Sequence, residues 1–434
     1  MSGRHRNAAA RAAPVTTQPA LPPVAGAPNP QQVKLQQWCA AFCGNADGTS
    51  VIAGLNHLGP IASFHDLIVA TGTGSPQTIV AAEQILHLIE GWRYASAAVN
   101  AYLTHGKGTT THLAYYAELR AAMSLFAGSG MRVRQKDYYY LDSNGAKVVA
   151  KSQSTHSAVW EIWTSWVRRP DAKSIFLDRI KLSPNVSLND VIGTLQFVNP
   201  TATLQGWGLD LIQLSDDHEA RNRASYEAYW MDTPLTTMAS SDVELVRNLW
   251  KLFLSDGSSL AFDQEFVRQC VEDALPGIVS LTQTLTPEQH REDISRKLAA
   301  NTGADKDFIL RRLIGTTPAI NPFTLAASPD CHAENVLCRS FFLLRLALLS
   351  LKGSLAITTN TAAKEWIKNW LTHAGIWSPT DGIDLTDLEE DYRISITDIS
   401  SAAPLPSALW TGDNLIHSAR LARPEACIAW GLVA

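Results

Sequence analysis

The sequence predicts a mainly α-helical protein, in which a helical bundle with a small β-hairpin insertion is followed by a second helical domain. Apolar residues recur at the spacing of a helix face, as in Ile85, Leu88, Ile89 and Trp92, which stand at positions i, i+3, i+4 and i+7. Strand-like patterning is confined to a stretch near residues 133–150. Hydrophobic residues make up 46% of the chain and charged residues 18%, so most of it can bury enough apolar surface to fold.

The length of 434 residues exceeds one ordinary core and predicts two folded domains, over residues 33–231 and 242–434, with a disordered tail over residues 1–32. The tail contains three arginines, no acidic residue and several prolines, and it lacks the continuous apolar segment that secretion requires. A basic start also matches an organelle transit peptide, but the prolines would break an amphipathic helix there.

In the first domain we expect helices over residues 33–42, 79–103, 112–127, 156–167 and 171–180, with loops at 44–50, 72–76 and 104–111. Between the helices expected over residues 112–127 and 156–167, the spacing of the apolar residues changes from that of a helix to that of strands. Tyr138 to Leu141 face Val148 and Val149 across Asn144-Gly145, and Asn-Gly is the strongest short signal for a hairpin.

Asp216 and Glu219 form an Asp-x-x-Glu capping box, which predicts a helix from Asp216 to about residue 230. The stretch 232–242 is rich in turn formers and is the expected domain boundary. Helices are then expected over residues 243–254, 263–275, 287–300, 306–314, 333–352 and 361–374. The pattern from residue 377 onward is too mixed for an assignment.

The formal charge of −5 and the pI near 6.2 give no global attraction to phosphate polymers, so nucleic-acid binding would need a local basic patch. Six scattered cysteines indicate reduced thiols and a cytoplasmic protein. The longest apolar run, residues 341–351, is interrupted by Arg345 and is shorter than the roughly 20 residues of a membrane span, so we expect no membrane segment.

Three further motifs do not predict a cofactor or metal. The sequence Gly106-Lys107-Gly108 lacks the upstream glycine of a phosphate-binding loop, because residue 101 is Ala, and a flexible loop is the better interpretation. The cysteines near residues 39–43 and 331–338 lack the spacing of structural zinc sites. The acidic run at residues 387–391 is typical of a solvated loop face rather than a cation site.

One polar stripe has a chemical interpretation. His218, Arg221, Asn222 and Ser225 stand at i, i+3, i+4 and i+7 near the expected start of the helix that begins at Asp216. Exposed amides and partial positive charge at a helix start favour an anion, and Arg221 would add bidentate donors. The alternative is a solvated face on which Arg221 pairs with Asp217 or another nearby acid.

The run from Arg221 to Tyr226 resembles the Arg-Asn-x-x-x-His motif of the HEPN superfamily, which comprises helical-bundle proteins of prokaryotic toxin–antitoxin and anti-phage systems. Many members are metal-independent ribonucleases, and the resemblance implies that Arg221 stabilises the RNA phosphate in the transition state while the His of the motif transfers a proton. Tyr226 stands where the family has its proton-transferring His. A phenol is a poor general base at neutral pH, so His218 or His156 would have to replace it. The resemblance covers residues 112–230 at most.

The helix that contains Tyr115, Tyr116, Glu118 and Arg120 is of the polar kind that, as the resemblance implies, packs against the Arg-Asn helix. Glu118 and Arg120 could orient Arg221 or form ion pairs across the bundle; the alternative is that they are surface residues. The first functional hypothesis is therefore a HEPN-like protein of a bacterial anti-phage defence or toxin system, either a ribonuclease acting through His218, Arg221, Asn222 and Tyr226 or a degenerate relative. Its ligand would be RNA or another phosphate compound. The second hypothesis is a non-catalytic adaptor or scaffold that binds a partner protein or forms a homo-oligomer.

Overall fold

The computed structural model describes residues 30–45, 49–59, 61, 63–134, 137–150, 154–195, 211–227, 240–257, 259–282, 285–378, 380, 385–402 and 414–433. These residues form a mainly α-helical protein with small antiparallel strand pairs, which confirms the predicted fold class. The expected tail lies outside the described residues, except that its last three residues already belong to the first helix.

The first half of the chain consists chiefly of helices that were expected from the apolar pattern. They are α1 (Pro30–Asn45), α2 (Thr49–Asn56), α3 (Phe64–Thr73), α4 (Pro76–Leu103), α5 (Lys107–Gly128), α6 (Thr155–Trp166), α7 (Pro170–Leu177), α8 (Leu188–Leu195) and α10 (Leu211–Tyr226). The predicted loop over residues 104–111 was too long, because α5 begins at Lys107. Thr110 and Thr111 lie in its first turns and donate hydroxyl hydrogen bonds to the i−4 carbonyls of Gly106 and Lys107, a local pattern that Thr adopts within a helix.

The predicted hairpin is confirmed as part of a three-stranded antiparallel sheet of β1 (Met131–Arg134), β2 (Asp137–Leu141) and β3 (Lys147–Ala150). Its turn depends on Gly145, whose φ of 74° is in the left-handed region, and on the Asp142 carboxylate, which accepts the backbone N–H groups of Asn144 and Ala146 at 2.9 Å. The outer strand β1 was not expected from the pattern.

The second half adds further helices and two short strand pairs. The helices are α11 (Ser240–Leu252), α12 (Ala261–Thr282), α13 (Pro287–Thr302), α14 (Lys306–Leu313), α15 (Pro322–Ala327), α16 (Ala333–Ile357), α17 (Thr361–His373), α18 (Leu385–Ala402), α19 (Asn414–Leu421), the 3₁₀ helix η4 (Pro424–Ala426) and α20 (Cys427–Val433). The strand pairs are β4 (Lys181–Ser183) with β5 (Val186–Ser187), and β6 (Ser255–Asp256) with β7 (Ser259–Leu260).

The acidic run at residues 387–391 lies on α18, so its interpretation as a loop face was wrong. Glu389 is buried and accepts hydrogen bonds from the backbone N–H and the hydroxyl of Ser255, and Asp391 pairs with Arg420. Part of this acidic run therefore joins α18 to its neighbours instead of facing water.

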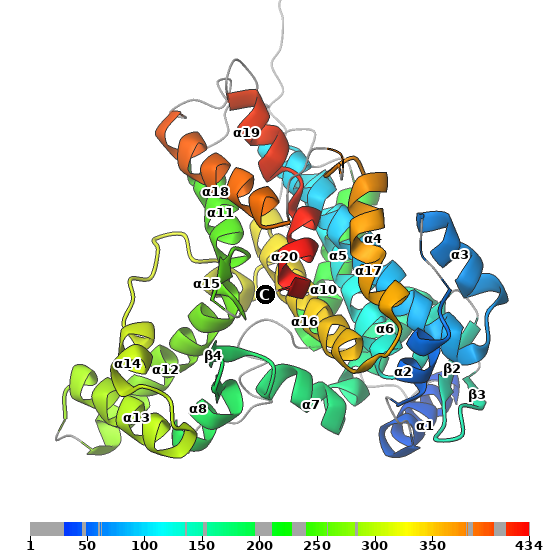
Figure 1. Cartoon of the computed structure of the whole chain (residues 1–434), viewed down its shortest axis with the longest axis horizontal. Helices are drawn as coiled ribbons and strands as arrows, with labels where there is room; N and C mark the ends of the chain where they lie inside the picture. The colour runs from blue at the N-terminus through cyan, green and yellow to red at the C-terminus, as the bar shows by residue number, and fades with distance from the viewer. Residues whose placement is uncertain are drawn as a thin grey trace, which may run out of the picture.

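The long helix α16 lies at the centre of the molecule, against α4 and α5, although these helices come from opposite halves of the chain (Figure 1). Residues of both expected domains form one continuous hydrophobic core. At one end of the molecule lie α12, α13 and α14, and at the other lie α1, α2 and the β2–β3 hairpin (Figure 1). Most of the expected domain boundary, residues 232–239, lies outside the described residues.

Two arginines of α16 are buried and ion-paired. Arg339 binds Asp217 of α10, and Arg345 binds Asp263 of α12. Among the described helices, α16 alone has the length and apolar composition of a membrane span, and 78% of its most apolar window is buried inside the protein.

Candidate functional site

The helix α10 packs against α5 and α6 and carries the stripe singled out in the sequence. Its buried face consists of Leu214, Asp217, Ala220, Arg221 and Ala224, at the 3–4 residue spacing of one helix face. Two charged residues of this largely hydrophilic helix, Asp217 and Arg221, thus face the protein interior. Each has a different set of partners.

The predicted start of this helix was wrong. The helix begins at Leu211, so Asp216 and Glu219 lie within it and form no capping box. Buried Leu214 lies ahead of the expected start and extends the inward face by one turn. Arg221 therefore lies in the second half of α10, and the expected contribution of a helix N-terminus to anion binding does not apply, because that effect is confined to the first turn. The predicted end near residue 230 lies outside the described residues, and the described helix ends at Tyr226.

Asp217 does not pair with Arg221, as the alternative interpretation supposed. Its two carboxylate oxygens accept hydrogen bonds from Arg339, at 2.7 Å from Nε and 2.6 Å from Nη2, and both side chains are fully buried. Glu118 lies beside this pair, and its burial together with the negative charge of Asp217 raises its pKa well above the usual range. Its surroundings thus favour the protonated form of Glu118 next to a structural ion pair.

Arg120, the other polar residue of α5 expected near Arg221, instead forms an ion pair with the neighbouring helix α4. Its guanidinium lies 3.1 Å from the carboxylate of Glu90 on α4 and 3.2 Å from the imidazole of His87. Of the two roles considered for Arg120, orientation of Arg221 or ion pairing across the bundle, the structure shows the second.

The Arg221 side chain is 9% exposed and is held by uncharged groups. Its Nη1 donates to the amide oxygen of Asn222 at 2.6 Å, its Nη2 donates to the Tyr116 hydroxyl at 2.5 Å, and its Cζ lies 5.2 Å from the centre of the Tyr116 ring. Its buried Nε has no hydrogen-bond acceptor within the described part of the chain, and no carboxylate there forms an ion pair with it. A buried guanidinium with an unused donor favours an anion beside it, because burial of an unpaired charge is costly.

Two imidazoles stack beside this arginine. His156 of α6 and His218 of α10 have ring centres 5.4 Å apart and planes within 5° of parallel. Tyr115 stacks on both rings and accepts a hydrogen bond from Trp160, and its hydroxyl lies at hydrogen-bond distance, 3.1 Å, from His156 Nδ1. Nδ1 of His156 is therefore occupied by the Tyr115 hydroxyl, whereas His218 has no hydrogen bond among the described contacts.

A third histidine closes the other side of the site. His112 of α5 lies 2.6 Å from the Ser225 hydroxyl, and that hydroxyl donates its own proton to the carbonyl of Arg221. His112 Nδ1 is therefore the donor to Ser225, and its ring also contacts Tyr116 at 5.0 Å between centres. The hydrogen bond ties α5 to the last turn of α10.

These histidines are uncharged at neutral pH. Burial, followed by the positive charge of Arg221, lowers the pKa of His156 to about 4. The same two causes, in the same order, lower the pKa values of His218 and His112. Neutral imidazoles accept protons, and they add no positive charge to repel the Arg221 guanidinium.

Two cavities adjoin the cluster. One of about 590 Å³ is lined by His156 and His218, by Arg168, and by Glu161 and other residues of α1 and α6. A second of about 270 Å³ is lined by His156 and Tyr116 on its other side. Arg221 is not among the residues that line these two cavities, and it adjoins the smaller one through Tyr116.

Tyr226 lies at the end of α10 with 80% of its side chain exposed, and the described contacts include none between it and Arg221. The structure thus brings together Arg221, Asn222 and His218 from the predicted set and adds His156, which sequence reasoning had offered as a replacement base. His112 was missed, and Tyr116 had been named on its helix without a role at the site. Their spacing with Tyr115 on one face of α5 was the available signal.

Comparisons of the chain with models of protein families, with curated proteins and with solved structures gave no match. Within the described part of the chain, no three His, Cys, Asp or Glu side chains converge as ligands for a metal ion. All six cysteines are free thiols.

Proposed function

We propose that this protein is a HEPN-like member of a bacterial defence or toxin system that acts in the cytoplasm, binds RNA through Arg221 and cleaves it without a metal ion. The observation that supports this proposal most strongly is a buried, unpaired guanidinium beside two neutral imidazoles. A phosphodiester supplies the negatively charged partner that the Arg221 guanidinium lacks among the described residues. Arg is also the side chain best suited to two-point contact with phosphate oxygens.

His218 is the group best placed to act as the base. It is neutral, it lines the larger cavity, and its ring nitrogens have no hydrogen-bond partner among the described residues. In the reaction, His218 takes the proton of an RNA 2′-hydroxyl while that oxygen bonds to phosphorus. The 5′-oxygen leaves with a proton from water, and Arg221 stabilises the charge that develops on the phosphoryl oxygens.

This assignment changes which residue replaces the family's missing histidine. Tyr226 follows the motif in sequence, but its side chain faces solvent. His218 lies one turn before Arg221 on the same helix and stacks on His156. The proton acceptor would thus precede the Arg-Asn pair in the sequence.

The test is cleavage of a labelled single-stranded RNA by the purified full-length chain in the presence of a chelator. Arg221→Gln is expected to abolish cleavage, because it removes the charge while keeping an amide for Tyr116. Arg223→Gln is the matched control, since Arg223 is exposed on the same helix. His218→Gln should remove cleavage but retain RNA binding.

Circular dichroism would verify that each variant keeps its helical content. Equal cleavage by Arg221→Gln and the unaltered chain would refute the proposal. So would an unaltered chain that neither cleaves RNA nor binds it more tightly than Arg221→Gln does.

A second candidate function, an adaptor that binds a partner protein or a second copy of this chain, is favoured by a different observation. Ile394 of α18 and Leu415 and Ile416 of α19 are each between 44% and 53% exposed on two helices that contact one another. Grouped exposed apolar side chains are typical of interaction surfaces. Co-purification of a partner that is lost with Ile416→Ser but kept with Arg221→Gln would favour this role.

A further inference from the structure

A further cavity lies in the other half of the chain, away from α10 and its histidines. It has a volume of about 730 Å³, within the range of small-molecule sites, and is formed by α11, α12, α14 and the segment between α14 and α15. None of its lining residues belongs to the Arg221 site.

Buried polar side chains form part of its wall. Arg268, Asn248, Gln264 and Asn321 line the cavity although each is at most 9% exposed. The polar atoms of a small ligand could therefore meet amide groups held in fixed positions. Asn248, for example, is anchored by a 2.9 Å hydrogen bond from its Nδ2 to the carbonyl of Ile320.

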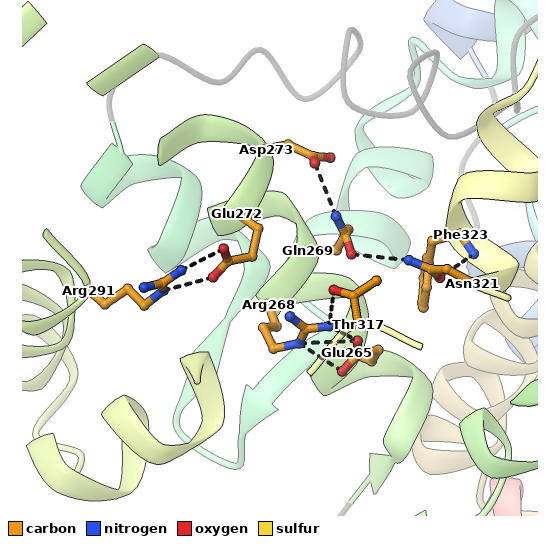
Figure 2. A network of polar contacts seen from close by, with 9 residues as sticks. All are labelled: Glu265, Arg268, Gln269, Glu272, Asp273, Arg291, Thr317, Asn321 and Phe323. Atoms are coloured by element: carbon orange, nitrogen blue, oxygen red, sulfur yellow. Dashed lines mark hydrogen bonds and ion pairs between the residues drawn. The ribbon is translucent and has the colours of Figure 1, made fainter. Parts of the chain in front are cut away.

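A polar network that includes the lining residues Glu265, Arg268 and Asn321 fixes this wall (Figure 2). Arg268 donates to Glu265 and to Thr317, and Asn321 donates to Gln269 of α12. The segment between α14 and α15 is thereby fastened to α12. Glu272 of α12 binds Arg291 of α13 through two hydrogen bonds of 2.8 and 2.7 Å, which anchors the helix from the other side (Figure 2).

The charge of the lining is unbalanced. Arg268 is paired with Glu265, and Arg312 forms a bidentate pair with Asp256. The other two lining cations, Lys251 and Arg311, form no ion pair with any described residue, so the lining carries an excess of two positive charges. A phosphate monoester has a charge of about −1.5 to −2 at pH 7, which matches this excess.

The remaining lining is mostly apolar. Phe308, Ile314, Pro318 and Pro322 contribute to it, and Ile314 is 60% exposed. A planar ring could lie against these groups while amides of the wall meet its edge.

We propose that this cavity binds a nucleoside monophosphate, with the phosphate at Lys251 and Arg311 and the base against the apolar wall. The proposal concerns a site separate from the ribonuclease site and does not depend on it. Arg221→Gln is therefore expected to leave this binding unchanged.

The experiment is calorimetric titration of the full-length chain with AMP, adenosine and inorganic phosphate at constant ionic strength. AMP should bind saturably, and Lys251→Gln/Arg311→Gln should weaken it at least about tenfold, the usual effect of losing charge-assisted hydrogen bonds. Lys306→Gln removes a charge from an exposed residue of α14 outside the lining and should leave AMP binding unchanged. The two single variants are measured as well, in case the double variant does not fold.

Ile314→Ser separates recognition of the ring from recognition of the phosphate. It should weaken AMP and adenosine alike and leave inorganic phosphate unaffected. The proposal is overturned if AMP does not bind saturably, if the charge variants bind AMP as the unaltered chain does, or if Lys306→Gln weakens binding as much as they do.

Discussion

Replacement of Arg339 by Met tests how much the fold depends on its central ion pair. Arg339 is fully buried, and besides its two bonds to Asp217 it donates to the backbone carbonyls of Ala326, Ser328 and Asp330 at 2.9–3.2 Å. Methionine fills much of the same volume but leaves these acceptors without donors and leaves the Asp217 carboxylate buried without a cation.

Removal of one partner of a buried ion pair destabilises a protein by about 3–5 kcal/mol. We expect Arg339→Met to lie in this range, because five hydrogen bonds are lost at a site without access to water. The matched control is Arg296→Met, which removes an arginine that is 71% exposed and paired with Asp293 on the surface of α13. Exposed pairs contribute about 0–1 kcal/mol.

The assay is urea denaturation of the full-length chain, followed by both tryptophan fluorescence and circular dichroism, since coincident transitions are needed before free energies are compared. Asp217→Asn combined with Arg339→Met should recover part of the lost stability, because the unpaired charge is then absent. An Arg339→Met variant within about 1 kcal/mol of the unaltered chain would refute the reasoning, since it falls in the range of a surface pair.

Three other predictions concern titration and backbone geometry. The pKa of Glu118 is raised in the folded state, so the protonated acid stabilises the fold at low pH, and this contribution is lost as the pH rises through the folded-state pKa. Glu118→Gln should therefore flatten the dependence of the free energy of unfolding on pH above about 4.5. An unchanged slope in urea denaturation at several pH values would contradict this. Arg221→Gln should raise the pKa of His156 above about 4, because burial remains but the neighbouring positive charge is gone, and NMR titration of the imidazole would report an unaltered value if Arg221 did not act on it. Gly145→Ala should destabilise the hairpin by about 1–2 kcal/mol, because φ is 74° and an added Cβ would lie 2.3 Å from Nε2 of Gln77. If the variant has the same midpoint of thermal unfolding as the unaltered chain, the turn relaxes without cost and the prediction is wrong.

The parts of the fold that sequence predicted correctly are those with local causes. The hairpin followed from Asn144-Gly145, because only a few residues decide the conformation of a turn. The predicted start of α10 was wrong because its extra turn depends on the burial of Leu214 in the hydrophobic core, which the local pattern does not show. The partners of Arg339 and Arg345 could not be predicted at all, because Asp217 and Asp263 lie 122 and 82 residues away and no periodicity links them.

The same distinction explains what the sequence revealed about the candidate site. The spacing of His218, Arg221 and Asn222 on one helix is local, and it was read correctly as one polar stripe. The neighbours that give the stripe its chemistry, Tyr116 and His156, come from α5 and α6. Only the packing of three helices shows that the imidazoles are neutral and that Arg221 is held by a phenol.

The contrast between Arg339 and Arg221 bears directly on function. Both arginines are buried: Arg221 belongs to α10, and Arg339 of α16 binds Asp217 of α10. Arg339 contacts a carboxylate and three backbone carbonyls, whereas Arg221 contacts an amide, a hydroxyl and an aromatic ring. Desolvation of an uncompensated guanidinium disfavours folding by several kcal/mol, so a purely structural role would be served better by an apolar side chain of similar volume. An anionic ligand that binds only the folded chain reverses this balance, because its binding energy adds to the stability of the fold. The free energy of unfolding should therefore rise when a short RNA is added to the unaltered chain and stay constant when it is added to Arg221→Gln.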